Sequence, residues 1–313
     1  MSEIRINIKT ISVLMLWCVT QFAAAQDWPR VFHNVDGTET IIEHQPKRIL
    51  STSVTLTGTL MAIDAPVVGS ATTTAGDFFA QWASLAKQRG VEPLWSAGSV
   101  DLESVYAMAP DLIVVSTSGA DSAMAQVEEF RELAPTIVLD YSDLSWQQLA
   151  EKLAQATGQE QAAKRNITQF DQLVEKTRQE IVVPKGKTNI ISFQGAGVIN
   201  AIAKQQGTHA QLLQSLGFDI EAPQPSWQAG PIAHRDFMRV HYENLSALTA
   251  PTTFLLSRER DDIGHFIHDP VLHNLASVKA KQVYGLGKNS FRVDLFSATE
   301  IVNNIADIFS RSK

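Results

Sequence analysis

The sequence predicts an α/β fold in which two Rossmann-like lobes are bridged by one long backbone helix. Hydrophobic strand-like runs alternate with helical segments in both halves of the chain, and a 23-residue stretch without glycine or proline separates the halves. Alternation of strands and helices is typical of sheets covered by helices. Each half is therefore expected to form one lobe, residues 26–158 and 182–313, with the helix 159–181 between them.

The central stretch has the period of an amphipathic helix. Its less polar positions recur every four or three residues, which places them on one side of a helix. They are Ala163, Ile167, Phe170, Val174, Thr177 and Ile181. Such a helix spans roughly 34 Å, the width of a small domain. Periodicity alone is equally compatible with a surface helix of one large α/β domain.

The first 25 residues are predicted to be a signal peptide that is not part of the fold. Arg5 and Lys9 form a positive region, residues 11–22 are apolar, and Ala23-Ala24-Ala25 is a small-residue cleavage site. A retained N-terminal anchor is the alternative, although the apolar run is short for a membrane span. We expect export and cleavage before Gln26.

The composition excludes several functional classes. The chain is 44% hydrophobic and 19% charged, as globular proteins are. Its formal net charge of −7 argues against nucleic acid or an anionic membrane as the partner. Cys18 is the only cysteine and lies within the predicted signal peptide. The mature chain therefore has no disulfide and no thiolate for catalysis or metal binding.

In the N-terminal half, an extended lead-in is expected to turn at Asp36-Gly37. Asp77 is placed to cap one helix and Gly90 to end it. The near-continuous apolar run 112–117 is typical of a strand covered on both faces. The expected strands are 48–53, 67–70, 112–117 and 136–140, and the expected helices are 57–63, 77–88, 101–108, 122–133 and 144–157.

The C-terminal half repeats the pattern. The expected strands are 188–193, 252–257 and 283–286, and the expected helices are 209–216, 242–248, 271–275 and 294–310. In a protein with two such lobes, the cleft between them is the natural ligand site.

Arginines recur where strands of the C-terminal half end. Arg258 and Arg260 follow one predicted strand, Arg292 follows the last one, and Arg235 lies in a loop. The ends of strands face the ligand crevice in open α/β sheets. Arginine can bind a carboxylate or catecholate oxygen there with two donors at once. Each one alone fits a surface charge, but several together indicate an anion site.

The histidines and the missing motifs define two alternatives. His265, His268 and His273 are the tightest group of potential metal ligands, but they lie in a predicted polar loop, which favours solvated side chains. A free transition metal or haem bound by this group is the alternative ligand. An exported enzyme is the third hypothesis. No GxSxG, HExxH or P-loop is present, so we expect no enzyme activity.

Four segments carry a resemblance to a known family: residues 48–66, 109–123, 145–149 and 281–300. They resemble the periplasmic ferric-enterobactin-binding proteins of Gram-negative bacteria, which bind catecholate siderophores and serve iron-siderophore ABC importers. The likeness covers most of the mature chain and is weakest near residues 72–79 and 198–232.

The resemblance implies a helical-backbone periplasmic binding protein. It would capture a ferric catecholate siderophore, of the enterobactin or vibriobactin type, between its lobes and deliver it to an inner-membrane ABC permease. The siderophore holds the iron, so the protein needs cations and aromatic faces but no metal ligands and no cofactor. A monomer in the periplasm is expected.

The resemblance also implies site residues. Arg292, in the segment FRVD, matches the family's cleft arginine. The further candidates are chosen by position: Arg258, Arg260 and Arg235 as cations, and Trp95 and Trp227 as stacking walls. For each tryptophan, a place in the hydrophobic core is the alternative.

Permease docking in this family uses one acidic residue on each lobe. Glu103 in SVDLESV and Glu243 in HYENL match those positions. Two solvated helix carboxylates are the alternative.

The chain departs from the enterobactin-binding pattern at two loops. Residues 72–76 form a shorter loop without a basic residue, and residues 198–204 lack an aromatic residue. The resemblance implies that both loops belong to the ligand pocket. A different catecholate or a catechol–oxazoline siderophore therefore fits as well as enterobactin.

Overall fold

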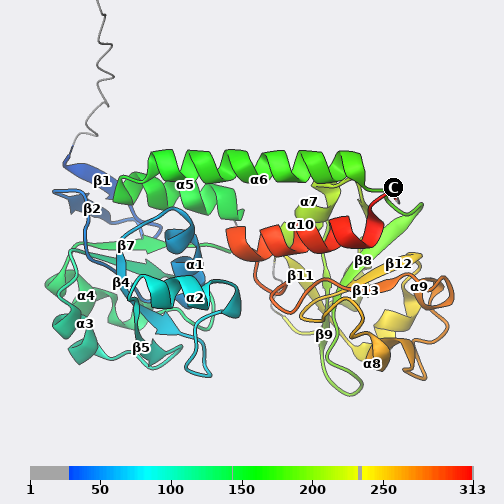
Figure 1. Ribbon diagram of the computed structural model, residues 1–313. Coiled ribbons are helices and arrows are strands. Elements are labelled where there is room, and N and C mark those ends of the chain that lie inside the picture. Colours follow the sequence, from blue (N-terminus) through cyan, green and yellow to red (C-terminus); the bar gives the residue numbers. More distant parts are fainter. Residues whose placement is uncertain (1–27, 143, 232–234, 312–313) are drawn as a thin grey trace, which may run out of the picture.

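The computed structural model describes residues 28–142, 144–231 and 235–311 and consists of two α/β lobes joined by one long helix (Figure 1). The predicted two-lobed fold is confirmed. The predicted signal peptide lies outside the described residues. Among the described helices, none is long and apolar enough to cross a membrane.

The N-terminal lobe is built on a parallel sheet with strand order β5-β4-β3-β6-β7. All residues of β6 and β7 are buried, as their apolar sequences predict. β1 and β2 form a separate antiparallel ribbon that turns at Asp36-Gly37. The strands are β1 (Arg30–His33), β2 (Glu39–Ile42), β3 (Ile49–Ser51), β4 (Val67–Thr72), β5 (Glu92–Ser96), β6 (Leu112–Ser116) and β7 (Thr136–Leu139).

Helices cover this sheet at nearly the predicted places. They are α1 (Val54–Ala62), α2 (Ala80–Gln88), α3 (Leu102–Met108), the 3₁₀ helix η1 (Met124–Gln126), α4 (Val127–Leu133) and α5 (Trp146–Thr157). The predicted cap at Asp77 is wrong. The residue before α2 is Phe79, which makes no capping hydrogen bond with its side chain.

The C-terminal lobe is built on a mixed sheet with strand order β11-β9-β8-β12-β13, to which β10 adds by pairing with β8. β8, β10, β12 and β13 pair in parallel, while β9 pairs antiparallel with both β8 and β11. The strands are β8 (Lys187–Ser192), β9 (Asn200–Ala203), β10 (Asp219–Ile220), β11 (Phe237–Val240), β12 (Thr252–Leu255) and β13 (Val283–Gly285).

One of the helices predicted for this lobe does not form. They are α7 (Thr208–Ser215), the 3₁₀ helices η2 (Pro225–Trp227) and η3 (Tyr242–Ala247), α8 (Gly264–Ile267), α9 (Ala276–Lys279) and α10 (Leu295–Phe309). The predicted helix at residues 271–275 is wrong, because that segment forms turns. The Asp269 carboxylate accepts hydrogen bonds from the backbone N–H groups of Val271 and Leu272 and so competes with helix formation.

Helix α6 (Glu160–Glu180) occupies the predicted central stretch and extends across both lobes. α5 lies beneath it over the N-terminal lobe, and α10 lies beneath it over the C-terminal lobe (Figure 1). Phe170 of α6 is buried and meets Trp146 edge to face, with 5.1 Å between the ring centroids. One hydrophobic cluster runs without interruption through α1, α5, α6 and α10.

The two lobes also meet directly where α10 begins. Asp294 caps α10 by accepting a hydrogen bond from the Ser297 N–H, and its other oxygen accepts one from Gln81 of α2, at 3.1 Å. A Cβ on Gly58 of α1 would lie 2.8 Å from Asp294 Oδ2 and 2.9 Å from Trp82 Nε1. Only glycine lets α1 approach the start of α10 this closely.

We expect Gly58→Ala to lower the free energy of unfolding by about 1–3 kcal/mol, because the added methyl group overpacks this contact. Alanine's higher helix propensity offsets part of the loss, by up to about 1 kcal/mol. Urea unfolding measures it. Gly264→Ala is the control, since a Cβ on Gly264 meets nothing within 4 Å. Equal stability of Gly58→Ala and wild type would contradict the packing argument.

Candidate functional site

Arg258 and Arg292 follow the carboxyl ends of the neighbouring parallel strands β12 and β13. The loop after β12 folds back on β13: the Gly287 N–H donates to the Arg258 carbonyl at 2.7 Å, and the Gly285 N–H to the Arg260 carbonyl at 3.0 Å. A Cβ on Gly285 would overlap the Glu259 carbonyl. Backbone contacts therefore hold both arginine-bearing loops at this edge.

The Arg292 side chain lies beside an aromatic pair. Its guanidinium carbon is 5.5 Å from the centroid of the Phe291 ring. Phe291 stacks on Phe237 of β11, with an interplanar angle of 10° and a centroid distance of 6.3 Å. The Phe291 side chain is 45% exposed, which is unusual for phenylalanine. Neither ring was predicted from the sequence as a site residue, although Phe291 directly precedes the predicted arginine.

His209 of α7 contacts the loop that carries Arg292. Its side chain is buried, and Nε2 lies 2.7 Å from the Ser290 carbonyl oxygen, so Nε2 carries the proton and donates. Ser290 Oγ in turn accepts a hydrogen bond from the Ser257 N–H, at 3.0 Å. Burial lowers the pKa of His209 below its ordinary value of 6.5. A neutral histidine therefore links the two arginine loops.

Across from these loops, the carboxyl edge of the N-terminal sheet carries a buried carboxylate. Asp121, in the loop after β6, is 5% exposed. Its Oδ2 accepts hydrogen bonds from Ser53 Oγ at 2.6 Å and from the Thr55 N–H at 3.1 Å, and the Tyr141 hydroxyl donates to Oδ1 at 3.2 Å. Burial raises the pKa of Tyr141 and the Asp121 charge raises it further, whereas the positive charge of Arg292 opposes the rise.

The sequence analysis missed this carboxylate cluster, too. Its residues come from three strand ends that are far apart in the chain, in the segments STSVT and STSGAD and at Tyr141. The only signal was that small hydroxyl residues follow β3 and β6. Gln81 of the N-terminal lobe binds Asp294, two residues after Arg292, so the two lobes approach each other at this segment.

The other ligand-site candidates lie in different surroundings. Arg260 is exposed, although its carbonyl takes part in the pairing with β13. Arg235 is half-buried next to Asp236, which accepts a hydrogen bond from the N–H of Thr208 at the start of α7. Trp95 on β5 is only 7% exposed and belongs to the core of the N-terminal lobe. Trp227 is half-buried against the core of the C-terminal lobe. Packing alone thus accounts for both tryptophans, and their stacking role stays a prediction.

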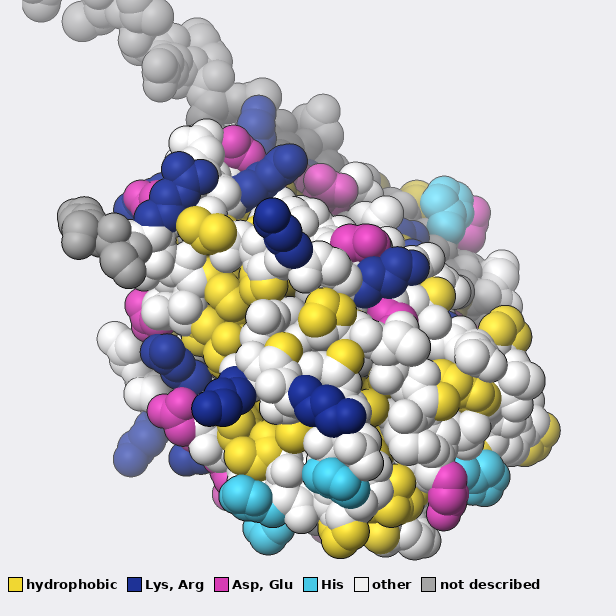
Figure 2. Space-filling model, turned by 90° about the vertical axis from the view of Figure 1, so that its right-hand side faces the viewer, with side chains coloured by type: hydrophobic (Ala, Val, Ile, Leu, Met, Phe, Trp, Pro, Cys, Tyr) yellow, Lys and Arg dark blue, Asp and Glu magenta, His cyan; other side chains and the backbone are white. Residues whose placement is uncertain are grey.

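The described histidines of the C-terminal lobe form no metal centre. Among the described residues, no three histidine, cysteine or acidic side chains are placed to hold a metal ion. His265, His268 and His273 are exposed, and His273 Nδ1 lies 2.6 Å from the Pro270 carbonyl oxygen. Figure 2, which faces this lobe, shows histidines at several separate places among interspersed basic and acidic side chains.

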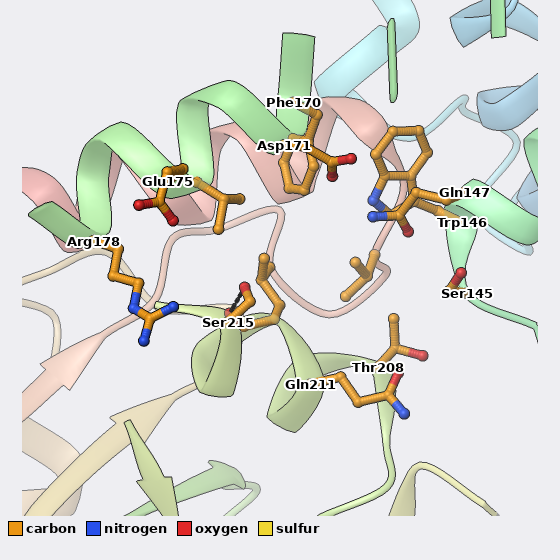
Figure 3. Close-up of a pocket in the computed structure, with 13 residues that line it drawn as sticks. Ser145, Trp146, Gln147, Phe170, Asp171, Glu175, Arg178, Thr208, Gln211 and Ser215 are labelled. Carbon is orange, nitrogen blue, oxygen red and sulfur yellow. Dashed lines mark hydrogen bonds between the residues drawn. The ribbon is translucent and has the colours of Figure 1, made fainter. Parts of the chain in front are cut away.

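A cavity of about 470 Å³ lies against helix α6 (Figure 3). α6, α7 and the start of α5 form its walls, with apolar contributions from Trp146, Phe170, Val174, Leu212 and Val293. Asp171, Glu175 and Arg178 line up along α6 at its upper edge (Figure 3). None of the predicted ligand-binding residues lines this cavity, although Val293, which directly follows Arg292, does.

The two predicted docking glutamates are both exposed, one on each lobe. Glu103 lies in the first turn of α3, where its N–H donates to the Asp101 carboxylate that caps the helix. Glu243 lies in the first turn of η3, next to the buried Tyr242. Neither position tests the docking role, which stays a prediction.

The model of the periplasmic binding protein family matches residues 49–290. The chain belongs to this family. It is 36% identical over 295 residues to the ferric enterobactin-binding periplasmic protein FepB of Escherichia coli O6:H1, covering 91% of this chain and 92% of FepB. The resemblance found in the sequence is thereby confirmed. Membership implies a place in the periplasm and relatives that bind solutes.

Solved structures agree with this assignment. The crystal structure of holo-ViuP is 57% identical, with a TM-score of 0.88, and the match covers 91% of this chain and 96% of ViuP. The FhuD protein from S. pseudintermedius shares the fold at 16% identity and a TM-score of 0.71, covering 90% of this chain and 98% of FhuD. The catecholate-siderophore binding protein VctP from Vibrio cholerae shares it at 15% identity and 0.62, covering 90% and 98%.

The buried His209 makes stability depend on pH. Because its pKa is lowered in the folded state, its contribution is fully present above pH 6.5 and is lost as the pH falls through the lowered value. We expect the free energy of unfolding of His209→Gln, which keeps a donor for Ser290, to fall less than that of wild type below pH 6.5. Urea unfolding between pH 7 and pH 5 measures this.

His268→Gln, an exposed replacement, is the control and should follow wild type over the same range. Parallel pH curves for wild type and His209→Gln would show that His209 does not titrate as its burial demands.

Proposed function

We propose that this protein captures a ferric catecholate siderophore, of the enterobactin or vibriobactin type, and delivers it to an inner-membrane ABC permease. The observation that carries the proposal is the pair of arginines in the loops that follow the adjacent strands β12 and β13, with the exposed Phe291 ring beside Arg292. FepB, which is similar over nearly the whole chain, is named for binding ferric enterobactin.

The chemistry of such a ligand fits these residues. Three catecholates bring six negative oxygens to a trivalent iron, so the complex is an anion with aromatic rings at its periphery. A pair of unit charges 4 Å apart is worth about 4 kcal/mol at an effective dielectric constant near 20, before desolvation. Arginine can both attract the oxygens and stack on the rings. Arg258, Arg292 and Phe291 would supply these contacts.

The remaining parts of the proposal follow from this role. The siderophore keeps the iron, so the protein needs no cofactor and catalyses no reaction. Residues 1–25 would direct export and be cleaved near Ala25, and the mature protein would act as a monomer. The missing basic residue in the loop 72–76 supports a ligand other than enterobactin as the natural one. Arg260, Arg235, Trp95 and Trp227 remain further candidate contacts.

Tryptophan-fluorescence titration of the mature protein tests the ligand class. Saturable quenching by ferric enterobactin or ferric vibriobactin, and not by a ferric hydroxamate, is expected. Arg292→Gln and Arg258→Gln should each weaken catecholate binding by about tenfold to a hundredfold, as the loss of a charge-assisted contact does. Arg165→Gln is the control, since Arg165 lies on α6 and pairs with Asp64.

Tight binding of the hydroxamate, or of none of the three complexes, would contradict the proposed ligand. A visible absorbance scan of the ligand-loaded protein separates a ferric catecholate, with its broad charge-transfer band, from the haem alternative with its Soret band.

Docking on the permease is tested through Glu103 and Glu243. The double variant Glu103→Ala, Glu243→Ala should bind the siderophore as wild type does but support no uptake, because the acidic contacts with permease arginines are lost. Uptake of radioactive iron by whole cells and titration of the purified variant measure the two properties. Loss of siderophore binding in the purified variant would count against a docking role.

A further inference from the structure

The amino end of α1 is a place that attracts anions, and the chain fills it with its own carboxylate. The helix has nine residues, begins after β3 and directs its first N–H groups toward the carboxyl edge of the N-terminal sheet. Such ends favour negative charge and commonly bind anionic ligands. Here Asp121 accepts hydrogen bonds from the Thr55 N–H and the Ser53 hydroxyl. The Tyr141 hydroxyl binds its other oxygen.

The whole carboxyl edge of this lobe has the same sign of charge. The segments that follow its strands are 52–53, 73–79, 97–101, 117–126 and 140–145. Their described residues include four aspartates, which are Asp77, Asp101, Asp121 and Asp140, and no lysine or arginine. The loops after β12 and β13 instead contain four cations, Arg258, Arg260, Lys288 and Arg292, interspersed with the acidic residues Glu259, Asp261, Asp262 and Asp294. A bound anion would therefore face cations from one lobe only.

Asp121 is close enough to the arginine loops for its charge to matter. Gly58 lies one helical turn after Thr55, and a Cβ on it would be 2.8 Å from Asp294 Oδ2, two residues after Arg292. The Tyr141 hydroxyl donates to Asp121 at 3.2 Å, and the positive charge of Arg292 opposes the rise in the pKa of Tyr141. Asp121 is also 95% shielded from solvent, since only 5% of it is exposed. Water and salt screen a buried charge less than an exposed one.

We propose that Asp121 limits how much negative charge a ligand can place against the N-terminal lobe. The site then favours ferric complexes that turn their anionic oxygens toward Arg258 and Arg292 and an uncharged side, with amide or hydroxyl donors, toward Asp121 and Tyr141. This inference rests on the proposed capture of a ferric catecholate and adds a determinant of which complexes are accepted.

The test compares the affinity for ferric enterobactin, a trianionic complex, between wild type and Asp121→Asn. Asparagine keeps an oxygen for the Thr55 N–H but removes the charge. It also removes a counter-charge that competes with the ligand for Arg292. Both effects raise the affinity, by about tenfold at low ionic strength, and the gain shrinks as salt is added.

Asp111→Asn is the matched control. The Asp111 carboxylate also accepts two backbone N–H groups, those of Lys47 and Arg48 at 2.7 and 2.8 Å, but it precedes β6 and so lies at the opposite edge of the same sheet. The net charge changes equally in the two variants. The affinity of Asp111→Asn should equal that of wild type.

A second variant decides the matter if Asp121→Asn does not fold. Thr55→Lys leaves Asp121 in place and sets a cation next to it, so it too should raise the affinity for ferric enterobactin. Unchanged or lower affinity in a folded variant overturns the role of Asp121. If wild type itself binds no ferric catecholate, the proposed function fails instead, which distinguishes the two outcomes.

Discussion

The contact between the start of α10 and the helices α1 and α2 sets the relation of the two lobes. Asp294 belongs to the C-terminal lobe by sequence, yet Gln81 of the other lobe binds its carboxylate and Gly58 leaves room for it. Burial raises the pKa of Asp294. Arg292 lies two residues before this contact, so the same segment that joins the lobes also positions the arginine at the candidate site.

Each lobe contributes a different chemistry to the space between the strand ends. The C-terminal lobe brings arginines and an exposed phenylalanine, held by backbone pairing between the loops after β12 and β13. The N-terminal lobe brings hydroxyl groups and a buried carboxylate. A spherically symmetric anion matches only one of these surfaces. The arrangement therefore suits ligands whose charge is unevenly distributed over their surface.

Sequence reasoning found the elements that have a strong period and missed those that depend on partners. Helix α6 and the buried strands β6 and β12 follow from spacing and apolar runs alone. β9 and β11 have four residues each and form by antiparallel pairing, β9 with both β8 and β11. Asp121 could not be found for a related reason: its significance comes from Thr55 and Tyr141, which the fold brings beside it. Arg292 could be predicted because the segment around it resembles a known family.

The continuous hydrophobic cluster beneath α6 has a consequence for how the protein folds. Leu60 of α1, Phe170 of α6 and Ile301 of α10 belong to a single buried cluster. They come from the N-terminal lobe, the connecting helix and the C-terminal lobe. Neither half can bury its share of this surface by itself. The lobes are thus one cooperative folding unit, not two modules on a connector. Replacement of one lobe would therefore disturb the packing of the other.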